Sequence, residues 1–508
     1  MALFLESFAR VLQPDLLLIM ILGTIGGIAI GIIPGLTAIM AVTLLLPFTF
    51  GMEASAGMLM LVSVFFAGIY GGAITTILMK IPGTPASAAT LLDGGALGER
   101  GEGGRAIGVA TYASFIGCFT SAVVVATVSP QLARLALEFG PSEYFALAVF
   151  GLTIIASVSG KNLSKGLIAA CIGLILSAVG IDPITGFPRL TFGITNLLSG
   201  FAVVPLLIGF FAISVVLINV DEGANTIFKK QKIDRILPTW QDVKTCTPVS
   251  FRSALIGTLI GIIPGAGADI GAFVSYDMAK RFSKKSKLYG TGIIEGVAAP
   301  ESGNNATSGG AMVPMLSLGI PGDATTAVLL GALILQGLQP GPMLFAENPD
   351  VVYRIFAGMI VASILILVLG LLGLRLYIKL VSVKLYLLIP VIFLMCIIGS
   401  FALRNNFFDV YVTLIAGFIG YFFVKLEIPI APMVLAFILG PIIEVNLRRA
   451  YIISRGDLSI YASRPITIVL LALSLLFLMT PLFLQMRVRI SADLNTQNET
   501  LEQKLQNT

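Results

Sequence analysis

Apolar segments of membrane-span length recur along this chain and are separated by short polar loops. They lie near 106–128, 143–158, 164–181 and 200–220, and later near 351–378, 384–402, 408–424, 429–446 and 466–485. A helix needs about 20 mostly apolar residues to cross a bilayer, so the whole chain has room for about ten to twelve crossings or half-crossings. The pattern predicts an all-α polytopic membrane protein.

Two further apolar segments are interrupted by the same five residues. Gly-Ile-Ile-Pro-Gly occurs at Gly31–Gly35 and again at Gly261–Gly265. Proline removes a backbone donor and glycine loosens the helix, so each word predicts two half-helices that meet at a break. A simple proline kink within one continuous helix is the alternative.

The order of several short words indicates an internal repeat. Gly71-Gly72-Ala73 precedes Ile81-Pro82-Gly83, and Gly309-Gly310-Ala311 precedes Ile320-Pro321-Gly322. These pairs follow the two Gly-Ile-Ile-Pro-Gly words in the same order. We therefore predict a first transmembrane repeat over 1–220, a cytoplasmic basic linker over 221–252, a second repeat over 253–485, and a polar C-terminal tail over 486–508.

The placement of charge predicts how the two repeats are oriented. Pro264-Gly265 lies between basic stretches at 221–252 and 280–290, and a single crossing between them would place one outside the cell, against the positive-inside rule. A re-entrant hairpin keeps both in the cytoplasm. The first break is flanked instead by Asp15 and Glu53, which fits a hairpin that enters from the opposite face. The prediction is two inverted-topology repeats with re-entrant or broken helices.

Composition narrows the function classes. The 508 residues are 56% hydrophobic and 12% charged, with a mean hydropathy of +0.97, a net charge of +5 and no histidine. Histidine-based catalysis, metal ligation and proton relays are therefore excluded. The four cysteines have no metal-ligand spacing, and no Walker motif or nucleophile–base pair is present. These features predict a protein that is not an enzyme and holds no cofactor.

A polar run in the second half is the main candidate for a binding site. Residues 301–310 combine a carboxylate, amides, hydroxyls and glycines, and such groups lie at bilayer depth only where they line a cavity. An ordinary polar loop is the alternative. The substrate-binding candidates from this run are Ser302, Gly303, Asn304, Asn305, Thr307 and Ser308.

The breaks and the segment after residue 79 complete the candidate set. Half-helix N-termini present free N–H groups and partial positive charge to an anion. The candidates here are Pro34, Gly35, Thr37, Lys80, Pro82, Gly83, Thr84, Pro264, Gly265 and Gly267. Lys80 pairs with a carboxylate substrate if it lies at depth, or else it marks a helix end and reaches the interface.

Three carboxylates are candidates for a coupling cation. Asp269, Glu301 and Asp323 lie beside these polar stretches, and hard cations such as sodium take oxygen ligands. Structural pairing of these carboxylates with a Lys or Arg in a loop is the alternative.

These residues also carry a resemblance to a known family. The duplicated Gly-Ile-Ile-Pro-Gly, the segment from Tyr70 to Pro85 and the segment from Pro300 to Ala306 closely resemble the large membrane subunit of the tripartite tricarboxylate transporter family, over essentially 10–485. The resemblance implies a multi-pass protein of the bacterial inner membrane that works with a small membrane subunit and a periplasmic solute-binding protein.

The resemblance also implies a transport function. It implies sodium- or proton-coupled uptake of citrate-like tricarboxylates or other organic carboxylates. Breaks that enter from both faces favour alternating access. A passive anion channel or pore is the alternative.

Overall fold

The chain is helical almost throughout. A computed structural model describes residues 2–33, 35–80, 82–153, 163–223, 235–265, 267–381 and 385–479. The expected all-α class is confirmed, since the only strands among these residues form one two-stranded hairpin. Pro34, part of the basic linker and the polar tail lie outside the described residues.

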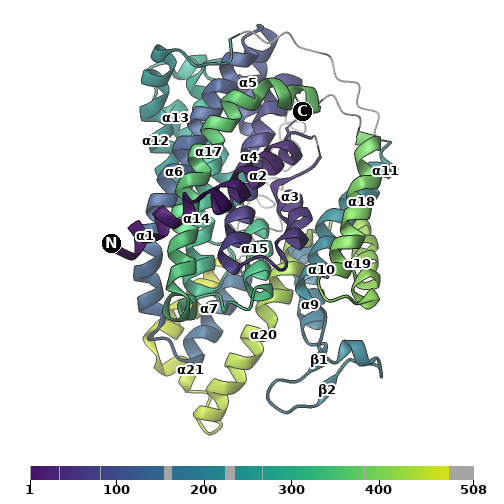
Figure 1. Ribbon diagram of the computed structural model, residues 1–508. Helices are drawn as coiled ribbons and strands as arrows, with labels where there is room; N and C mark the ends of the chain where they lie inside the picture. The colour runs from purple at the N-terminus through teal and green to yellow at the C-terminus, as the bar shows by residue number, and fades with distance from the viewer. Residues whose placement is uncertain are drawn as a thin grey trace, which may run out of the picture.

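The elements before residue 222 form a series of helices and one hairpin (Figure 1). They are α1 (Ala2–Val11), α2 (Pro14–Gly31), α3 (Ala38–Leu45), η1 (Leu46–Thr49), α4 (Ala54–Met79), η2 (Pro85–Ser87), α5 (Ala88–Glu99), α6 (Gly103–Ala136), α7 (Pro141–Thr153), α9 (Leu163–Ser177), β1 (Gly180–Ile181), β2 (Pro188–Arg189), η3 (Thr195–Leu197), α10 (Val203–Ile208), η4 (Gly209–Ile213) and α11 (Ser214–Asp221).

The later elements are all helical. They are α12 (Trp240–Ile262), α13 (Gly267–Phe282), η5 (Ser286–Leu288), α14 (Glu295–Leu318), α15 (Ala324–Leu335), α16 (Pro342–Glu347), α17 (Pro349–Val381), α18 (Leu385–Ala402), α19 (Phe407–Lys425), α20 (Ile430–Ile453), α21 (Ile460–Ser463) and a last helix over Pro465–Met479.

Membrane-span candidates are abundant among these helices. Within the described ranges, eight helices have the length and hydropathy needed to cross a membrane, and five shorter ones are also apolar. The described part of the chain therefore has the architecture of a multi-pass membrane protein. The expected ten to twelve segments, which include half-crossings, remain a prediction.

Both Gly-Ile-Ile-Pro-Gly words end one helix and precede another. Helix α2 ends at Gly31 and α3 begins only at Ala38, while α12 ends at Ile262 and α13 begins at Gly267. The hydroxyl of Thr37 accepts a hydrogen bond from the Met40 amide at 3.4 Å and so caps α3. These are breaks in the helix, not kinks.

Two segments for which the sequence pattern allowed a loop or predicted a linker, 301–310 and 240–252, are helical. Residues 301–310 form the middle of the buried helix α14, so they are not a loop. Residues 240–252, which we assigned to the linker, are the start of α12. The cause is a capping box, in which Thr239 and Asp242 each accept the other's backbone N–H, at 3.1 and 3.0 Å.

Glycines let the broken helices lie very close to their neighbours. Helix α2 packs along α4, and α12 packs along α14. A Cβ at Gly31 would lie 2.2 Å from the Gly68 carbonyl oxygen, and one at Gly261 would lie 2.2 Å from the Thr307 carbonyl oxygen. Only glycine permits these backbone approaches, which are typical of helix packing in membranes.

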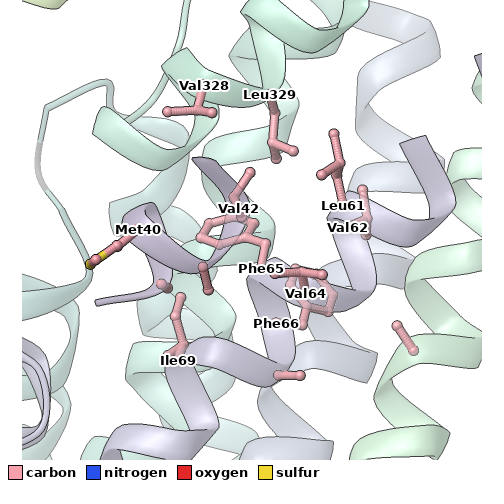
Figure 2. Close-up of a cluster of buried hydrophobic side chains, with 14 of the residues drawn as sticks. Met40, Val42, Leu61, Val62, Val64, Phe65, Phe66, Ile69, Val328 and Leu329 are labelled. Carbon is pink, nitrogen blue, oxygen red and sulfur yellow. The ribbon is translucent and has the colours of Figure 1, made fainter. Parts of the chain in front are cut away.

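The apolar core lies where α3, α4 and α15 meet (Figure 2). Val42 comes from α3, Phe65 and Phe66 from α4, and Val328 and Leu329 from α15, and all five side chains are buried. The half-helix α3 is thus held against α4 by side chains as well as by its cap. This packing fixes the position of its N-terminus.

Helix ends and loops from distant parts of the chain meet at one end of the molecule, which we call the basic end. It comprises residues 93–105, 235–242 and 283–293. The Arg105 guanidinium pairs with Asp242 at 2.5 Å, and the Asp93 carboxylate accepts the backbone N–H groups of Gly290, Gly292 and Ile293. Helices α5, α12 and α13 lie at this end, and the β1–β2 hairpin lies at the opposite end (Figure 1).

The close approach of α2 to α4 gives a test of stability. Gly31→Ala places a methyl group against the Gly68 backbone, where overpacking costs about 1–3 kcal/mol. Gly26→Ala is the matched control on α2, because its Cβ would meet only the flexible end of Leu45. Thermal unfolding in detergent should show a lower midpoint for Gly31→Ala alone. Equal midpoints for the two variants would contradict the packing described here.

Candidate functional site

A cavity of about 410 Å³ lies where the broken helices meet. Helices α3, α13 and α15 all begin at its wall, through Thr37, Gly267 and Asp323. The short turn η2, which leads into α5, adds Thr84. Several helix N-termini therefore point at one space, and each carries free N–H groups and partial positive charge.

Two of these N-termini are fixed by reciprocal caps. Thr84 accepts a hydrogen bond from the Ser87 amide at 3.3 Å, and Asp323 accepts one from the Thr326 amide at 2.7 Å. In each pair the hydroxyl oxygen of the second residue also accepts a hydrogen bond from the backbone N–H of the first, which makes the pair a capping box. The caps hold the chain in position beside the cavity.

The charged groups in the cavity wall are acidic. Asp269 lies in the first turn of α13 and Asp323 caps α15, and no Lys or Arg occurs among the described residues of the wall. Carboxylate, amide and hydroxyl oxygens are the ligands that sodium prefers, and the wall supplies all three kinds through Asp269, Asn304 and Thr37. The described residues contain no cluster of three or more His, Cys, Asp or Glu side chains that could hold a metal ion.

Asn304 is a buried polar side chain in this wall that lacks a hydrogen-bond partner among the described residues. It is 1% exposed, and neither its Oδ1 nor its Nδ2 has a hydrogen bond within the described part of the molecule. An unpaired buried amide costs about 1–3 kcal/mol. Because Asn304 faces the cavity, a ligand there would supply the missing hydrogen bonds.

The other candidates from the polar run are not part of the cavity wall. Asn305 Nδ2 donates to the Ser114 hydroxyl and to the Glu301 carbonyl, both at 2.9 Å. Ser302 donates to the Ser250 carbonyl at 2.7 Å, and Thr307 and Ser308 donate within their own helix. Gly303 packs against Ser275 of α13.

Glu301 lies in a separate buried network. Its carboxylate accepts a hydrogen bond from Thr90 of α5 at 2.5 Å and one from Ser114 of α6 at 3.5 Å. The side chain is fully buried and is not part of the cavity wall. The structure thus brings Asp269 and Asp323 to one place and Glu301 to another.

The remaining first-half candidates lie outside the wall. Lys80 ends α4 in the left-handed conformation, with φ of 58°, and its half-exposed side chain pairs with Glu99. Pro82 and Gly83 follow it, and a Cβ at Gly83 would lie 2.7 Å from the Gly72 Cα. Their role in the described structure is to turn the chain tightly from α4 into η2.

The breaks themselves contribute unevenly. Gly35 has φ of 85° and lies beside Asn219, away from the wall. Gly265 lines the cavity, and its N–H donates to the Gly322 carbonyl at 2.6 Å, which ties the second break to the segment before α15. Pro264 occupies the turn before it.

Sequence reasoning missed the apolar part of the wall. Helix α20 contributes Ala431 and Leu435, and α4 contributes Ile69. These are ordinary apolar residues within long apolar segments, so no pattern in the sequence marked them. The small residues Ala38, Ala268 and Ala324, which lie beside predicted positions, were the nearest available signal.

The fold and the cavity together define a class: a multi-pass helical membrane protein with a polar, ligand-sized space between broken helices, as in membrane transporters. The family model described as "Tripartite tricarboxylate transporter TctA family" matches residues 17–435. The chain belongs to this family of transporters, which are not enzymes.

Two proteins of Agrobacterium vitis are similar to the chain. An "uncharacterized 52.8 kDa protein in TAR-I ttuC' 3'region" is 34% identical over 472 residues, which cover 92% of this chain and 93% of that protein. An "uncharacterized protein in TAR-II ttuC' 3'region" is 40% identical over 219 residues, which cover 43% of this chain and 90% of that protein. No solved structure matches the chain.

The two neighbouring asparagines should differ in their effect on stability. Asn305→Ala removes hydrogen bonds to Ser114 and Glu301 and leaves buried groups unpaired, which costs about 1–3 kcal/mol. Asn304→Ala removes no internal hydrogen bond and takes away an unpaired buried amide, so the unfolding midpoint should stay the same or rise. Thermal unfolding of the ligand-free protein in detergent is the measurement. A large loss for Asn304→Ala would mean that its amide is already satisfied.

Proposed function

We propose that this chain is the large membrane subunit of a tripartite secondary transporter in the bacterial inner membrane. It takes up a tricarboxylate or another organic carboxylate, together with a sodium ion or a proton, by alternating access. A periplasmic solute-binding protein delivers the substrate, and a small membrane subunit completes the complex. The observation that carries the proposal is the unpaired, buried Asn304 in a cavity at which α3, α13 and α15 begin.

The cavity suits a small organic anion. Backbone N–H groups at the start of α13 and α15 act as fixed dipoles, and an anion at a helix N-terminus is stabilised by them. Asn304 adds a donor and an acceptor, which match the carboxylate and hydroxyl oxygens of a citrate-like molecule. A volume of about 410 Å³ lies within the range of small-molecule sites.

The two aspartates supply a reason for cation coupling. An anion that enters this cavity meets Asp269 and Asp323 and no basic side chain among the described wall residues. Its charge would be repelled unless a cation binds between the carboxylates or a proton neutralises one of them. Cation and substrate therefore favour each other's binding, which is the coupling that a symporter needs.

Matched contacts support two homologous repeats. Lys80 caps the C-terminus of α4 and Gly319 caps that of α14, both in the left-handed conformation, and each is followed by Ile-Pro-Gly and a capping box. The glycine contacts correspond in the same way: Gly27 approaches Val64 as Gly257 approaches Gly303, and Gly31 approaches Gly68 as Gly261 approaches Thr307.

Contacts between the two repeats support inverted orientations. Helix α6 of the first repeat packs along α14 of the second, and α17 of the second repeat packs along α4 of the first. The α12–α13 hairpin opens toward the basic end. The end of α3 lies at the other side, where Gln336 donates to the Thr49 carbonyl at 2.9 Å. Two hairpins that open in opposite directions suit gating from both faces.

Counterflow in proteoliposomes tests the proposal and its central residue. With the complete complex, internal citrate should accelerate the entry of labelled citrate, because a carrier exchanges solute and a passive pore does not. Asn304→Ala should raise the half-saturating citrate concentration about ten- to a hundredfold, since it removes a hydrogen bond to a charged ligand worth roughly 1.5–3 kcal/mol.

Thr307→Ala is the matched control for Asn304→Ala. Thr307 lies on the same helix, is equally buried and bonds only to the Gly303 carbonyl, away from the cavity. Its half-saturating concentration should stay within a factor of two or so of wild type. The absence of exchange stimulation would refute the carrier. Equal affinities in both variants would refute the site.

The cation prediction concerns Asp269 and Asp323. Asp269→Asn and Asp323→Asn should each weaken the dependence of uptake on sodium, or on pH if a proton is the coupling ion. Asparagine still caps a helix, so Asp323→Asn keeps the start of α15 intact. Asp350→Asn, at the start of α17 on the surface, is the control. Unchanged activation by sodium and by protons in both cavity variants would rule out a coupling site here.

A further inference from the structure

A second, larger cavity of about 720 Å³ lies alongside α15 and α20. Helices α7, α9 and α10, the end of α14 and the segment from Gln339 to Met343 form the rest of its wall. None of the sequence candidates lies in it. Its polar wall residues are Tyr144, Ser177, Ser199, Gln339, Asn446 and Arg449.

The two cavities follow one another along the same two helices. On α15, Thr325 lines the central cavity and Leu330 lines the second one, a distance of about 7.5 Å along the helix axis. On α20, Leu435 lines the central cavity and Phe437 and Ile438 line the second.

Arg449 gives the second cavity its charge. It is the one charged residue among the described residues of the wall, and no ion pair or hydrogen bond joins its exposed side chain to another described residue. The preceding residue, Arg448, pairs with Asp182 at 2.7 Å and with Glu444 at 3.3 Å. The two neighbouring arginines of α20 thus differ. Arg448 is neutralised by carboxylates, whereas Arg449 lines a cavity whose described wall has no acidic residue.

The cavity opens on the side of the β1–β2 hairpin. Val179 and Ser199, which line the cavity, flank the hairpin, and this end is opposite to the basic end (Figure 1). The hairpin is fixed to α20, because Arg189 pairs with Glu444 at 2.5 Å and Arg448 pairs with Asp182. The bond from Arg448 also holds the pKa of Asp182 well below its usual range. These ion pairs attach the hairpin to the helix that lines the cavity.

We propose that the second cavity is an outer vestibule in which the carboxylate substrate first binds, on Arg449, before it moves along α15 and α20 to the central site. This inference rests on the proposed transport function. A guanidinium pairs with a carboxylate through two parallel hydrogen bonds, and the neutral amides of Gln339 and Asn446 suit further carboxylate or hydroxyl oxygens. The wall has no acidic group to oppose the anion, in contrast to the central cavity.

Protection of an introduced thiol tests the vestibule. Ser199→Cys is made in a Cys171→Ser background, because Cys171 is exposed while Cys118, Cys246 and Cys396 are buried. In cells that carry the complete complex, a membrane-impermeant maleimide added outside should label this thiol, and citrate should slow the labelling. Met343→Cys, at another lining residue in α16, is the second reporter if Ser199→Cys fails to reach the membrane.

Substitution of Arg449 should weaken the protection of this thiol by citrate. Arg449→Ala should raise the citrate concentration for half-protection about three- to tenfold, as expected for a charge-assisted bond at a partly exposed site. It should also remove most of the salt dependence of protection, because screening acts on the charge that it deletes. Arg449→Lys should keep the salt dependence and recover only part of the affinity. Arg134→Ala, an exposed arginine near the end of α6 that does not line the cavity, should behave as wild type.

Three outcomes would overturn the vestibule. They are labelling only from the cytoplasmic side, absence of protection by citrate, and equal protection in wild type and Arg449→Ala. An anionic lipid headgroup could use the same guanidinium, so the purified complex is also labelled in phosphatidylcholine vesicles with and without phosphatidylglycerol. Protection by phosphatidylglycerol in place of citrate would assign the cavity to lipid and refute the proposal.

The Asn304→Ala variant tells a failure of the vestibule proposal apart from a failure of the proposed transport function. Asn304→Ala should leave citrate protection at Ser199→Cys intact, because the central amide is not part of the second cavity. If Asn304→Ala weakens counterflow affinity while citrate never protects Ser199→Cys, only the vestibule is wrong. If citrate neither protects the thiol nor shows counterflow, the transport proposal falls with it.

Discussion

The whole structure depends on the constraint that a helix broken within the membrane must still satisfy its backbone polar groups. Lipid offers no hydrogen-bond partners, and each unsatisfied group costs several kcal/mol. Here Thr37 caps α3, and the Gly265 N–H bonds to the Gly322 carbonyl. The close glycine contacts of α2 with α4 and of α12 with α14 keep these ends away from lipid. Thr37 after the first break and Gly265 and Gly267 of the second line the central cavity, where a ligand can contact them.

Much of the architecture could be predicted from the sequence, because apolar length and Gly-Pro words act locally. The helical class, the two breaks and the neighbourhood of Thr37, Gly267, Asp269 and Asp323 all follow from such local signals. The polar run was harder. Its residues are adjacent in sequence, but α14 distributes them around its axis, so only Asn304 reaches the cavity while Asn305 and Glu301 bond to α6 and α5. Which residue faces the cavity depends on how α14 is rotated about its axis and on which helices pack against it. Neither can be read from a single sequence.

The two halves contribute unequally to the central cavity despite their matched contacts. The second half supplies Asp269, Asp323 and Asn304, whereas the first half supplies the hydroxyls of Thr37 and Thr84 and the apolar Ile39. The two halves of the chain thus supply different kinds of groups to the central cavity. Lys80 was the one cation predicted near the site, and its place at the end of α4 beside Glu99 leaves helix N-termini as the source of positive potential.

The Asp93 carboxylate carries a consequence for how the protein is made. It is fully buried on α5, yet its described partners are the Tyr276 hydroxyl and the backbone N–H groups of Gly290, Gly292 and Ile293. During synthesis, α5 leaves the ribosome long before these partners do. Until they arrive, the carboxyl group must stay in contact with water or with the insertion machinery, because burial without partners is costly. The first half therefore completes its fold only after the start of the second half has been inserted. Folding of the two halves is thus linked during synthesis.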